Sequence, residues 1–350
     1  MRKILFTGGG SAGHVVPNIA LIEQLLSEGK TDVCYIGTNG IEKGIVAEWN
    51  IPYYAVDCPK LIRGGGFAAF KKNLKIPAAF FRAYKQAKKG LQTFQPDAVF
   101  SKGGYVALPV VFAAKKLKIP CFAHESDFSP GLANKLSARA CKKIFTSFPE
   151  TAKRFRRGVH SGAPIKRAVL SATKAEARKR LNIGFHQTVI LVFGGGSGSQ
   201  IINDALRKHI KTLTEKYVVL HVCGKGNSVE STLQNYRQFE FVSDMGSLYA
   251  CADLLVARAG AGTVFEALAL KKPALFIPLE GQTRGDQWEN AEYFSQKGLC
   301  KVLPQSQINR LPTAIEKTLT DEGLKARLNE SSFPPANDFI LQELERAIKK

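Results

Sequence analysis

A glycine-rich loop near the start of the chain could position a group for acid–base chemistry. It runs from Gly8 to Gly13, ends at His14, and follows an apolar segment at residues 3–7 that is typical of a buried strand. Glycines let the backbone approach a ligand closely, and the start of the following helix favours negative charge. A histidine at such a turn is often structural. Ligands bind at this position in open α/β sheets, however, so we interpret His14 as a candidate general base.

The same loop matches the dinucleotide pattern G-x-G-x-x-G at Gly8, Gly10 and Gly13. A dinucleotide site also needs an acidic residue after the second strand to bind the ribose. The chain instead reads Tyr-Ile-Gly-Thr-Asn at residues 35–39. A dinucleotide cofactor is therefore the weaker interpretation of this loop.

Two loops in the second half of the chain could bind a diphosphate. Residues 194–199, Gly-Gly-Gly-Ser-Gly-Ser, lie between an apolar run and a helical pattern, and their backbone amides suit an anion. They do not form a Walker A loop, because Lys and Ser/Thr are missing from the required places. Residues 258–263 are expected to lead into another helix, with Glu266 in its first turn. Glu266 either compensates the helix dipole or binds ribose hydroxyls, and the sequence leaves both open.

Positive charge is concentrated in the first half of the chain. The net charge is +21, and residues 1–165 contain 25 Lys and Arg against 10 Asp and Glu. Nine basic residues and no acidic residue lie between Cys58 and Gly90, interleaved with apolar side chains. This pattern favours contact with an anionic membrane surface, and a solvated basic helix with its phenylalanines in the core is the alternative. The predicted membrane patch consists of Ile62, Phe67, Phe70, Lys71, Lys72, Lys75, Phe80, Phe81 and Arg82.

The elements that must position these residues alternate between strands and helices, which predicts parallel sheets of the α/β class. Both halves begin with a strand, three glycines and a helix, so we predict two Rossmann-like domains at residues 1–163 and 164–350. A last helix at about 339–349 could pack on either domain. Strands are expected at 3–7, 33–36, 98–101, 121–123, 144–147, 189–193, 218–222, 240–242, 254–257 and 274–277, and helices at 17–28 and 174–181.

Composition excludes several classes of protein. With 45% hydrophobic and 23% charged residues, the chain is typical of a globular protein of two domains. We expect neither a signal peptide nor a membrane-spanning helix, and hence a cytoplasmic protein. The seven cysteines form no C-x-x-C pair, so no disulfide framework or zinc site is expected. No nucleic-acid module is recognisable, which makes nucleic acid an unexpected partner.

Seven segments, taken in order, resemble one family closely: the MurG family of UDP-N-acetylglucosamine:undecaprenyl-pyrophosphoryl-muramyl-pentapeptide transferases, which belongs to glycosyltransferase family 28. The resemblance covers nearly the whole chain. The segments are GGGSAGHVVPNIA at 8–20, SKGGYVALPV at 101–110, HESDFSPGLANK at 124–135, SGAPIK at 161–166, FGGGSGSQIIN at 193–203, RAGAGTVFEALA at 258–269 and RGDQWENA at 284–291.

The resemblance implies a GT-B fold, in which two Rossmann-like domains face a central cleft. It also implies inverting transfer of N-acetylglucosamine from UDP-N-acetylglucosamine to the 4-hydroxyl of undecaprenyl-pyrophosphoryl-N-acetylmuramyl-pentapeptide. No cofactor or metal is expected, and the chain contains no Asp-x-Asp motif. The family works at the cytoplasmic face of the cell membrane in peptidoglycan synthesis. An anionic membrane surface and other cell-wall synthesis proteins are therefore expected partners, with roles in cell shape and cell division.

The resemblance also assigns residues. His14 would be the catalytic base, and Gly103, Gly104, Tyr105 and Glu125 would bind the acceptor. Ser11, Ala12 and Gly13 would receive the acceptor diphosphate and also contact the donor. The remaining donor-binding residues would be Asp127, Lys166, Gly196, Ser197, Val242, Ala261, Gly262, Thr263, Val264, Phe265, Glu266 and Gln287.

Some positions depart from the family pattern. Many relatives have Asn at Asp127 and Arg at Lys166, and they have Ser-Gln where this chain has Gly196-Ser197. Asp286-Gln287 replaces the usual Gln-Gln pair. These differences leave open a paralogous GT-B transferase that acts on another lipid-linked or glycolipid acceptor. A polyanion-binding protein that is not an enzyme is the third interpretation.

Overall fold

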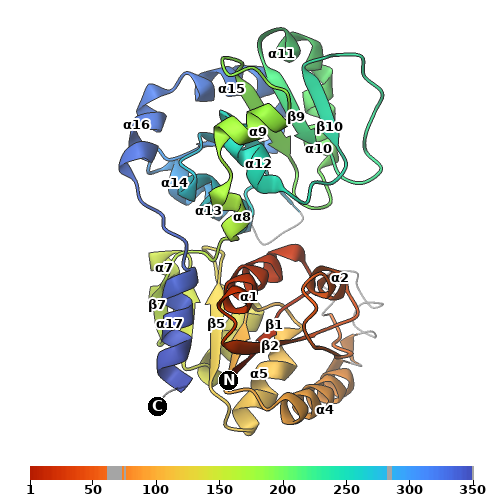
Figure 1. Cartoon of the computed structure of the whole chain (residues 1–350), viewed down its shortest axis with the longest axis vertical. Coiled ribbons are helices and arrows are strands. Elements are labelled where there is room, and N and C mark those ends of the chain that lie inside the picture. The colour runs from red at the N-terminus through yellow and green to blue at the C-terminus, as the bar shows by residue number, and fades with distance from the viewer. Residues whose placement is uncertain (61–72, 75, 282–285, 349–350) are drawn as a thin grey trace. The chain divides into compact units, whose positions relative to one another are not determined.

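The computed structural model describes residues 1–60, 73–74, 76–281 and 286–348. The chain divides into two compact units: unit 1 comprises Met1–Lys166 with Pro335–Lys350, and unit 2 comprises Arg167–Pro334 (Figure 1). Each unit contains one parallel sheet with helices packed against it. Among the described residues, no helix has both the length and the apolar character that crossing a bilayer requires.

The sheet of unit 1 has the strand order β3-β2-β1-β4-β5-β6-β7, and all its strand pairs are parallel. Its central strands β4 and β5 are buried along their whole length, and β1 is buried from Ile4 onward, as expected of strands covered on both faces. The strand order reverses between β1 and β4, and ligands bind at this point in such sheets. The strands are β1 (Arg2–Thr7), β2 (Thr31–Gly37), β3 (Tyr53–Ala55), β4 (Ala98–Ser101), β5 (Cys121–Glu125), β6 (Lys143–Thr146) and β7 (Gly158–His160).

The last helix, α17 (Asn337–Ile348), packs on unit 1, as its blue ribbon beside β7 in Figure 1 shows. Ile340 and Leu344 are fully buried in the same core as Ile4 of β1. The Asn337 side chain accepts a hydrogen bond from the Ile165 amide (3.0 Å) and donates to the Ile165 carbonyl (3.0 Å). The other helices of unit 1 are η1 (Ala12–His14), α1 (Val16–Glu28), α2 (Ile41–Ala47), α4 (Ile76–Phe94), α5 (Ala107–Lys116), α6 (Leu132–Ser137), η2 (Ala138–Ala140) and α7 (Pro149–Lys153).

Unit 2 also contains one parallel sheet, with the strand order β10-β9-β8-β11-β12-β13. Its strands are β8 (Val189–Phe193), β9 (Val218–Val222), β10 (Tyr236–Phe239), β11 (Leu254–Ala257), β12 (Ala274–Phe276) and β13 (Lys301–Val302). Its helices are α8 (Arg167–Ser171), α9 (Lys174–Arg180), α10 (Gln200–Lys208), α11 (Ile210–Lys216), α12 (Met245–Cys251), α13 (Ala261–Ala269), α14 (Asp286–Ser295), η3 (Gln305–Arg310), α15 (Leu311–Leu319) and α16 (Glu322–Glu330).

One predicted strand is wrong. The expected strand at residues 240–242 lies beyond the sheet, because β10 already ends at Phe239. Phe241 is 74% exposed, and the Glu240 carboxylate accepts a hydrogen bond from the Ser228 hydroxyl (2.7 Å). The apolar pair at 241–242 therefore does not mark a buried strand. The short strands β3 and β13 are not apparent from the sequence.

Candidate functional site

Buried polar side chains form hydrogen bonds with the backbone of the first glycine loop. The Tyr35 hydroxyl donates to the Gly8 carbonyl (2.8 Å), and the Gly10 amide donates to the Glu42 carboxylate (3.2 Å). Glu42 is fully buried and also accepts from the Thr38 amide (2.8 Å). These contacts tie the loop after β1 to the loop after β2. Sequence reasoning missed Glu42, because nothing in its local pattern distinguishes it from a solvated glutamate.

His14 lies where the loops after β1 and β4 meet. It is half-buried at the end of η1, and its Nδ1 forms a hydrogen bond with the Ser11 hydroxyl (2.9 Å). Gly104 has a φ of +79°, and a Cβ there would lie 2.4 Å from the Gly9 carbonyl oxygen and 3.4 Å from His14 Nδ1. A side chain would clash, so only glycine permits this close approach.

Tyr105 also lies against the first loop. Gly10 has a φ of +83°, and a Cβ there would lie 2.6 Å from the Tyr105 ring. The structure therefore brings together Ser11 and His14 with the predicted acceptor residues Gly103, Gly104 and Tyr105. The predicted residues Ala12 and Gly13 lie in η1 between Ser11 and His14.

Glu125, expected to bind the acceptor, supports its own loop. It ends β5, is 5% exposed, and accepts from the Gly131 amide (2.7 Å), the Asn134 side chain (3.0 Å) and the Asp127 amide (3.1 Å). Burial and the charge of Asp127 raise the pKa of the Glu125 carboxyl above its ordinary value. Its position indicates a role in shaping the loop after β5. Asp127 is half-buried in that loop, and Lys166 is half-buried at the end of unit 1.

In unit 2, Arg258 connects the loops that the sequence predicted to bind diphosphate. It follows β11, and its guanidinium donates to the Ser199 hydroxyl (2.9 Å) and to the Ile277 and Pro278 carbonyls (3.0 Å each). The loops after β8, β11 and β12 are thus fixed to one another at the carboxyl ends of their strands. Gly198 (φ +76°) packs tightly on the loop after β9, since a Cβ there would lie 2.1 Å from the Cys223 carbonyl oxygen. Arg258 lies in the segment RAGAGTVFEALA, but the sequence does not predict that it connects these loops.

The prediction that Glu266 falls in the first turn of its helix is wrong: α13 begins at Ala261, so Glu266 lies in the second turn, where a buried tyrosine binds its carboxylate. The Tyr249 hydroxyl donates a hydrogen bond to the Glu266 carboxylate (2.8 Å). Burial, and to a smaller extent the charge of Glu266, raises the pKa of Tyr249 well above its ordinary value. Tyr249 therefore stays protonated and fixes one carboxylate oxygen. Open space beside the α-carbon, where a ligand could approach the backbone, is found at Gly195, Gly196, Gly260 and Gly262.

The remaining predicted donor residues have different environments. Ser197 is exposed, Thr263 is half-buried and Ala261 is buried at the start of α13. Val264 and Phe265 are buried, so any ligand contact from them must come from the backbone. Val242 is half-buried in the loop after β10, and the Gln287 side chain accepts from the Leu279 amide (3.0 Å).

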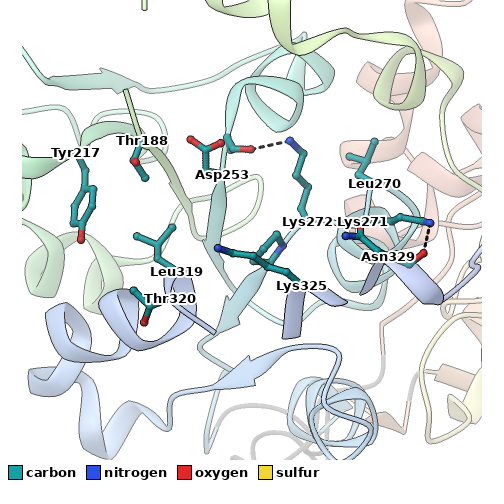
Figure 2. A pocket seen from close by; sticks show the side chains of 12 residues that line it. Thr188, Tyr217, Asp253, Leu270, Lys271, Lys272, Leu319, Thr320, Lys325 and Asn329 are labelled. Carbon is teal, nitrogen blue, oxygen red and sulfur yellow. Dashed lines mark hydrogen bonds between the residues drawn. The ribbon is translucent and has the colours of Figure 1, made fainter. Parts of the chain in front are cut away.

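A cavity of about 670 Å³ opens where the strands of the unit 2 sheet begin, at the end opposite the loops that Arg258 connects (Figure 2). Its lining includes Thr188, Tyr217 and Asp253, which precede β8, β9 and β11. The ammonium groups of Lys271 and Lys272 donate to the carbonyls of Asn329 and Ala252 (2.7 Å each). This cavity contains none of the predicted donor residues. Nor do the described residues include a group of three His, Cys, Asp or Glu side chains placed to hold a metal ion.

Comparisons with known proteins identify the family of this chain. The family model described as "Glycosyltransferase family 28 N-terminal domain" matches residues 4–146. The model described as "Glycosyltransferase family 28 C-terminal domain" matches residues 189–343. A curated relative from Clostridium botulinum (strain Alaska E43 / Type E3) is 40% identical over 99% of each chain. It is named UDP-N-acetylglucosamine--N-acetylmuramyl-(pentapeptide) pyrophosphoryl-undecaprenol N-acetylglucosamine transferase. The chain belongs to glycosyltransferase family 28.

Other members of family 28 support the same assignment. A relative from Bacillus thuringiensis subsp. konkukian (strain 97-27), whose printed name is the same with the suffix 2, is 38% identical over 99% of this chain and 100% of its own. The crystal structure of Acinetobacter baumannii MurG superposes with a TM-score of 0.74 at 27% identity, covering 99% of this chain and 100% of that one. The predicted fold class, α/β with two Rossmann-like domains of the GT-B type, is thereby confirmed.

Proposed function

We propose that this family 28 enzyme transfers N-acetylglucosamine from UDP-N-acetylglucosamine to undecaprenyl-pyrophosphoryl-N-acetylmuramyl-pentapeptide, converting lipid I to lipid II in peptidoglycan synthesis. The observation that carries the proposal is the 40% identity, over 99% of each chain, to a relative named for this reaction. The loops fixed by Arg258 in unit 2 suit the UDP diphosphate, and Glu266 suits its ribose. The loops around His14 and Gly104 in unit 1 suit the acceptor.

The proposed mechanism is a single displacement with inversion at the anomeric carbon. His14 accepts the proton of the acceptor 4-hydroxyl as that oxygen attacks, and its hydrogen bond to Ser11 fixes the imidazole orientation. UDP leaves as negative charge develops on its β-phosphate. The amides at the start of α13 and in the loop after β8 are suited to stabilise that charge. We assign no step to a metal ion or a cofactor.

The decisive test is a UDP-release assay with purified protein and UDP-N-acetylglucosamine, with and without a short-chain lipid-linked muramyl-pentapeptide. We expect UDP release that depends on the acceptor. A protein that binds UDP but releases none with this acceptor would favour the alternative, a paralogue with another lipid-linked or glycolipid acceptor.

We further propose that the enzyme is peripheral on the cytoplasmic membrane face, through a surface that includes α4. This helix buries Ala83, Ala87 and Leu91, whereas Phe81 is 57% exposed with the Lys85 ammonium 4.8 Å from its ring centroid. Phe80 instead packs edge-on against Phe112 of α5, and Arg82 is exposed. The other members of the predicted patch, Ile62, Phe67, Phe70, Lys71, Lys72 and Lys75, lie outside the described residues.

An anionic membrane surface and other cell-wall synthesis proteins are the proposed partners of this surface. Association with them would link the enzyme to cell shape and cell division. The basic segment between Cys58 and Gly90, which contains no acidic residue, supports the membrane part of this proposal.

Replacing Leu74 and Phe81 together by glutamine is expected to weaken binding to anionic vesicles about tenfold or more, because burying one phenylalanine stabilises by about 1.5–3 kcal/mol. Both side chains are exposed in unit 1, so the fold and the activity on a short-chain acceptor should be unchanged. Vesicle co-sedimentation measures the binding. Phe185→Gln is the matched control, since Phe185 is 67% exposed in unit 2. Equal sedimentation of the double variant and the control would contradict the assignment.

A further inference from the structure

A buried lysine adjoins the two glycine loops of unit 1, the loop after β1 and the loop after β4. Lys102 follows β4, where the strand order of the sheet reverses, and it is 2% exposed. A Cβ on Gly8 would lie 3.1 Å from the Cβ of Lys102. The next two residues, Gly103 (φ +86°) and Gly104 (φ +79°), form the turn that approaches His14. Lys102 thus contacts the loop after β1 and is the first residue of the loop after β4.

The charge of Lys102 has no direct partner among the described residues: its ammonium forms neither a hydrogen bond nor an ion pair within 4.0 Å there. Burial lowers the pKa of this ammonium, although the charges of Glu125 and Asp127 favour its protonated form. The Glu125 carboxylate is already bound by the Gly131 amide and the Asn134 side chain. A buried cation is costly unless it is paired, so Lys102 is suited to pair with an anionic ligand.

We propose that Lys102 binds the diphosphate of the lipid-linked acceptor, in addition to the glycine loops. This inference rests on the proposed function and adds a residue to its acceptor site. A diphosphate fits better than a single carboxylate, because it carries enough charge and enough oxygens to reach both Lys102 and backbone amides of the loops. Glu125 and Asp127 are positioning residues: their charges favour the protonated form of Lys102, and Glu125 shapes the loop beside it.

The first test is steady-state kinetics of Lys102→Met, which keeps the length of the side chain and removes its charge. We expect the KM for the lipid-linked acceptor to rise about 10- to 100-fold, the range of a lost charged hydrogen bond. The KM for UDP-N-acetylglucosamine should stay within about twofold, and the Tm should be equal or higher because an unpaired buried charge is gone. Lys115→Met, at the exposed end of α5, is the matched control.

A lower Tm with both KM values raised would indicate a purely structural role for Lys102 and overturn the proposal. A raised KM for the donor alone would assign the lysine to the UDP diphosphate and overturn it as well.

The second test does not depend on the transfer reaction. With unit 2 saturated by UDP, inorganic pyrophosphate is titrated into the protein by calorimetry. We expect binding to the wild type and to Lys115→Met, and binding at least tenfold weaker to Lys102→Met. No pyrophosphate binding to the UDP-saturated wild type, or equal binding to Lys102→Met, would overturn the anion site. Lys102-dependent pyrophosphate binding, in a protein that does not use the muramyl acceptor, would support the anion site and refute the proposed acceptor.

Discussion

Replacement of His14 by alanine is expected to lower turnover about 10²- to 10⁴-fold, the usual contribution of a general base. The affinity for UDP should be unchanged, because His14 belongs to unit 1 whereas the loops suited to UDP belong to unit 2. The acceptor KM should change little, since proton transfer is needed in the transition state rather than in the bound complex. The assay is acceptor-dependent UDP release, combined with calorimetric titration of UDP.

His160→Ala is the matched control, since His160 is exposed at the end of β7 in the same unit. It should retain wild-type turnover. Ser11→Ala tests the orientation of the imidazole and should cost less than His14→Ala, because the base itself remains. If His14→Ala instead lost UDP affinity and kept its turnover, His14 could not be the base.

The sequence predicts the strands well where they are buried on both faces. Four of them, 98–101, 189–193, 218–222 and 254–257, have the predicted bounds, because continuous apolar runs bounded by polar turns are characteristic of parallel strands. The strand at the sheet edge, β10, was misplaced to 240–242. Only Tyr236 of β10 is buried, so apolar content is a poor guide there.

The glycine loops and His14 could be predicted from the sequence, because a run of glycines directly after an apolar segment indicates a turn that a ligand can approach closely, and His14 ends such a run. The residues that hold the loops could not. Glu42 reaches Gly10 from another element, and Arg258 reaches Ser199 across 59 positions of the chain. Their partners are set by the pairing of strands, so a local pattern carries no sign of them. Lys102 lies in the segment SKGGYVALPV, but its burial depends on the packing of Gly8 against the residues that end β4.

Replacement of Glu266 by alanine is expected to weaken UDP binding by about 1–3 kcal/mol, or roughly 5- to 150-fold, the scale of a lost hydrogen bond to a charged group. The side chain is half-buried on α13 beside Gly262, where a ribose could reach it. Its hydrogen bond from Tyr249 fixes the carboxylate before UDP arrives, so little conformational entropy is lost on binding. Calorimetric titration with UDP measures the change.

Loss of Glu266 also removes the acceptor of the buried Tyr249 hydroxyl, so a structural effect must be separated from a loss of ligand contact. Tyr249→Phe removes the hydroxyl and keeps the carboxylate; it should bind UDP within about threefold of the wild type, because only the restraint on Glu266 is lost. Glu330→Ala, at the exposed end of α16, controls for the change in net charge. Equal losses of UDP affinity in Glu266→Ala and Tyr249→Phe would mean that the pair supports the site. A loss confined to Glu266→Ala, with its Tm lowered no more than that of Tyr249→Phe, would assign the carboxylate to the ribose.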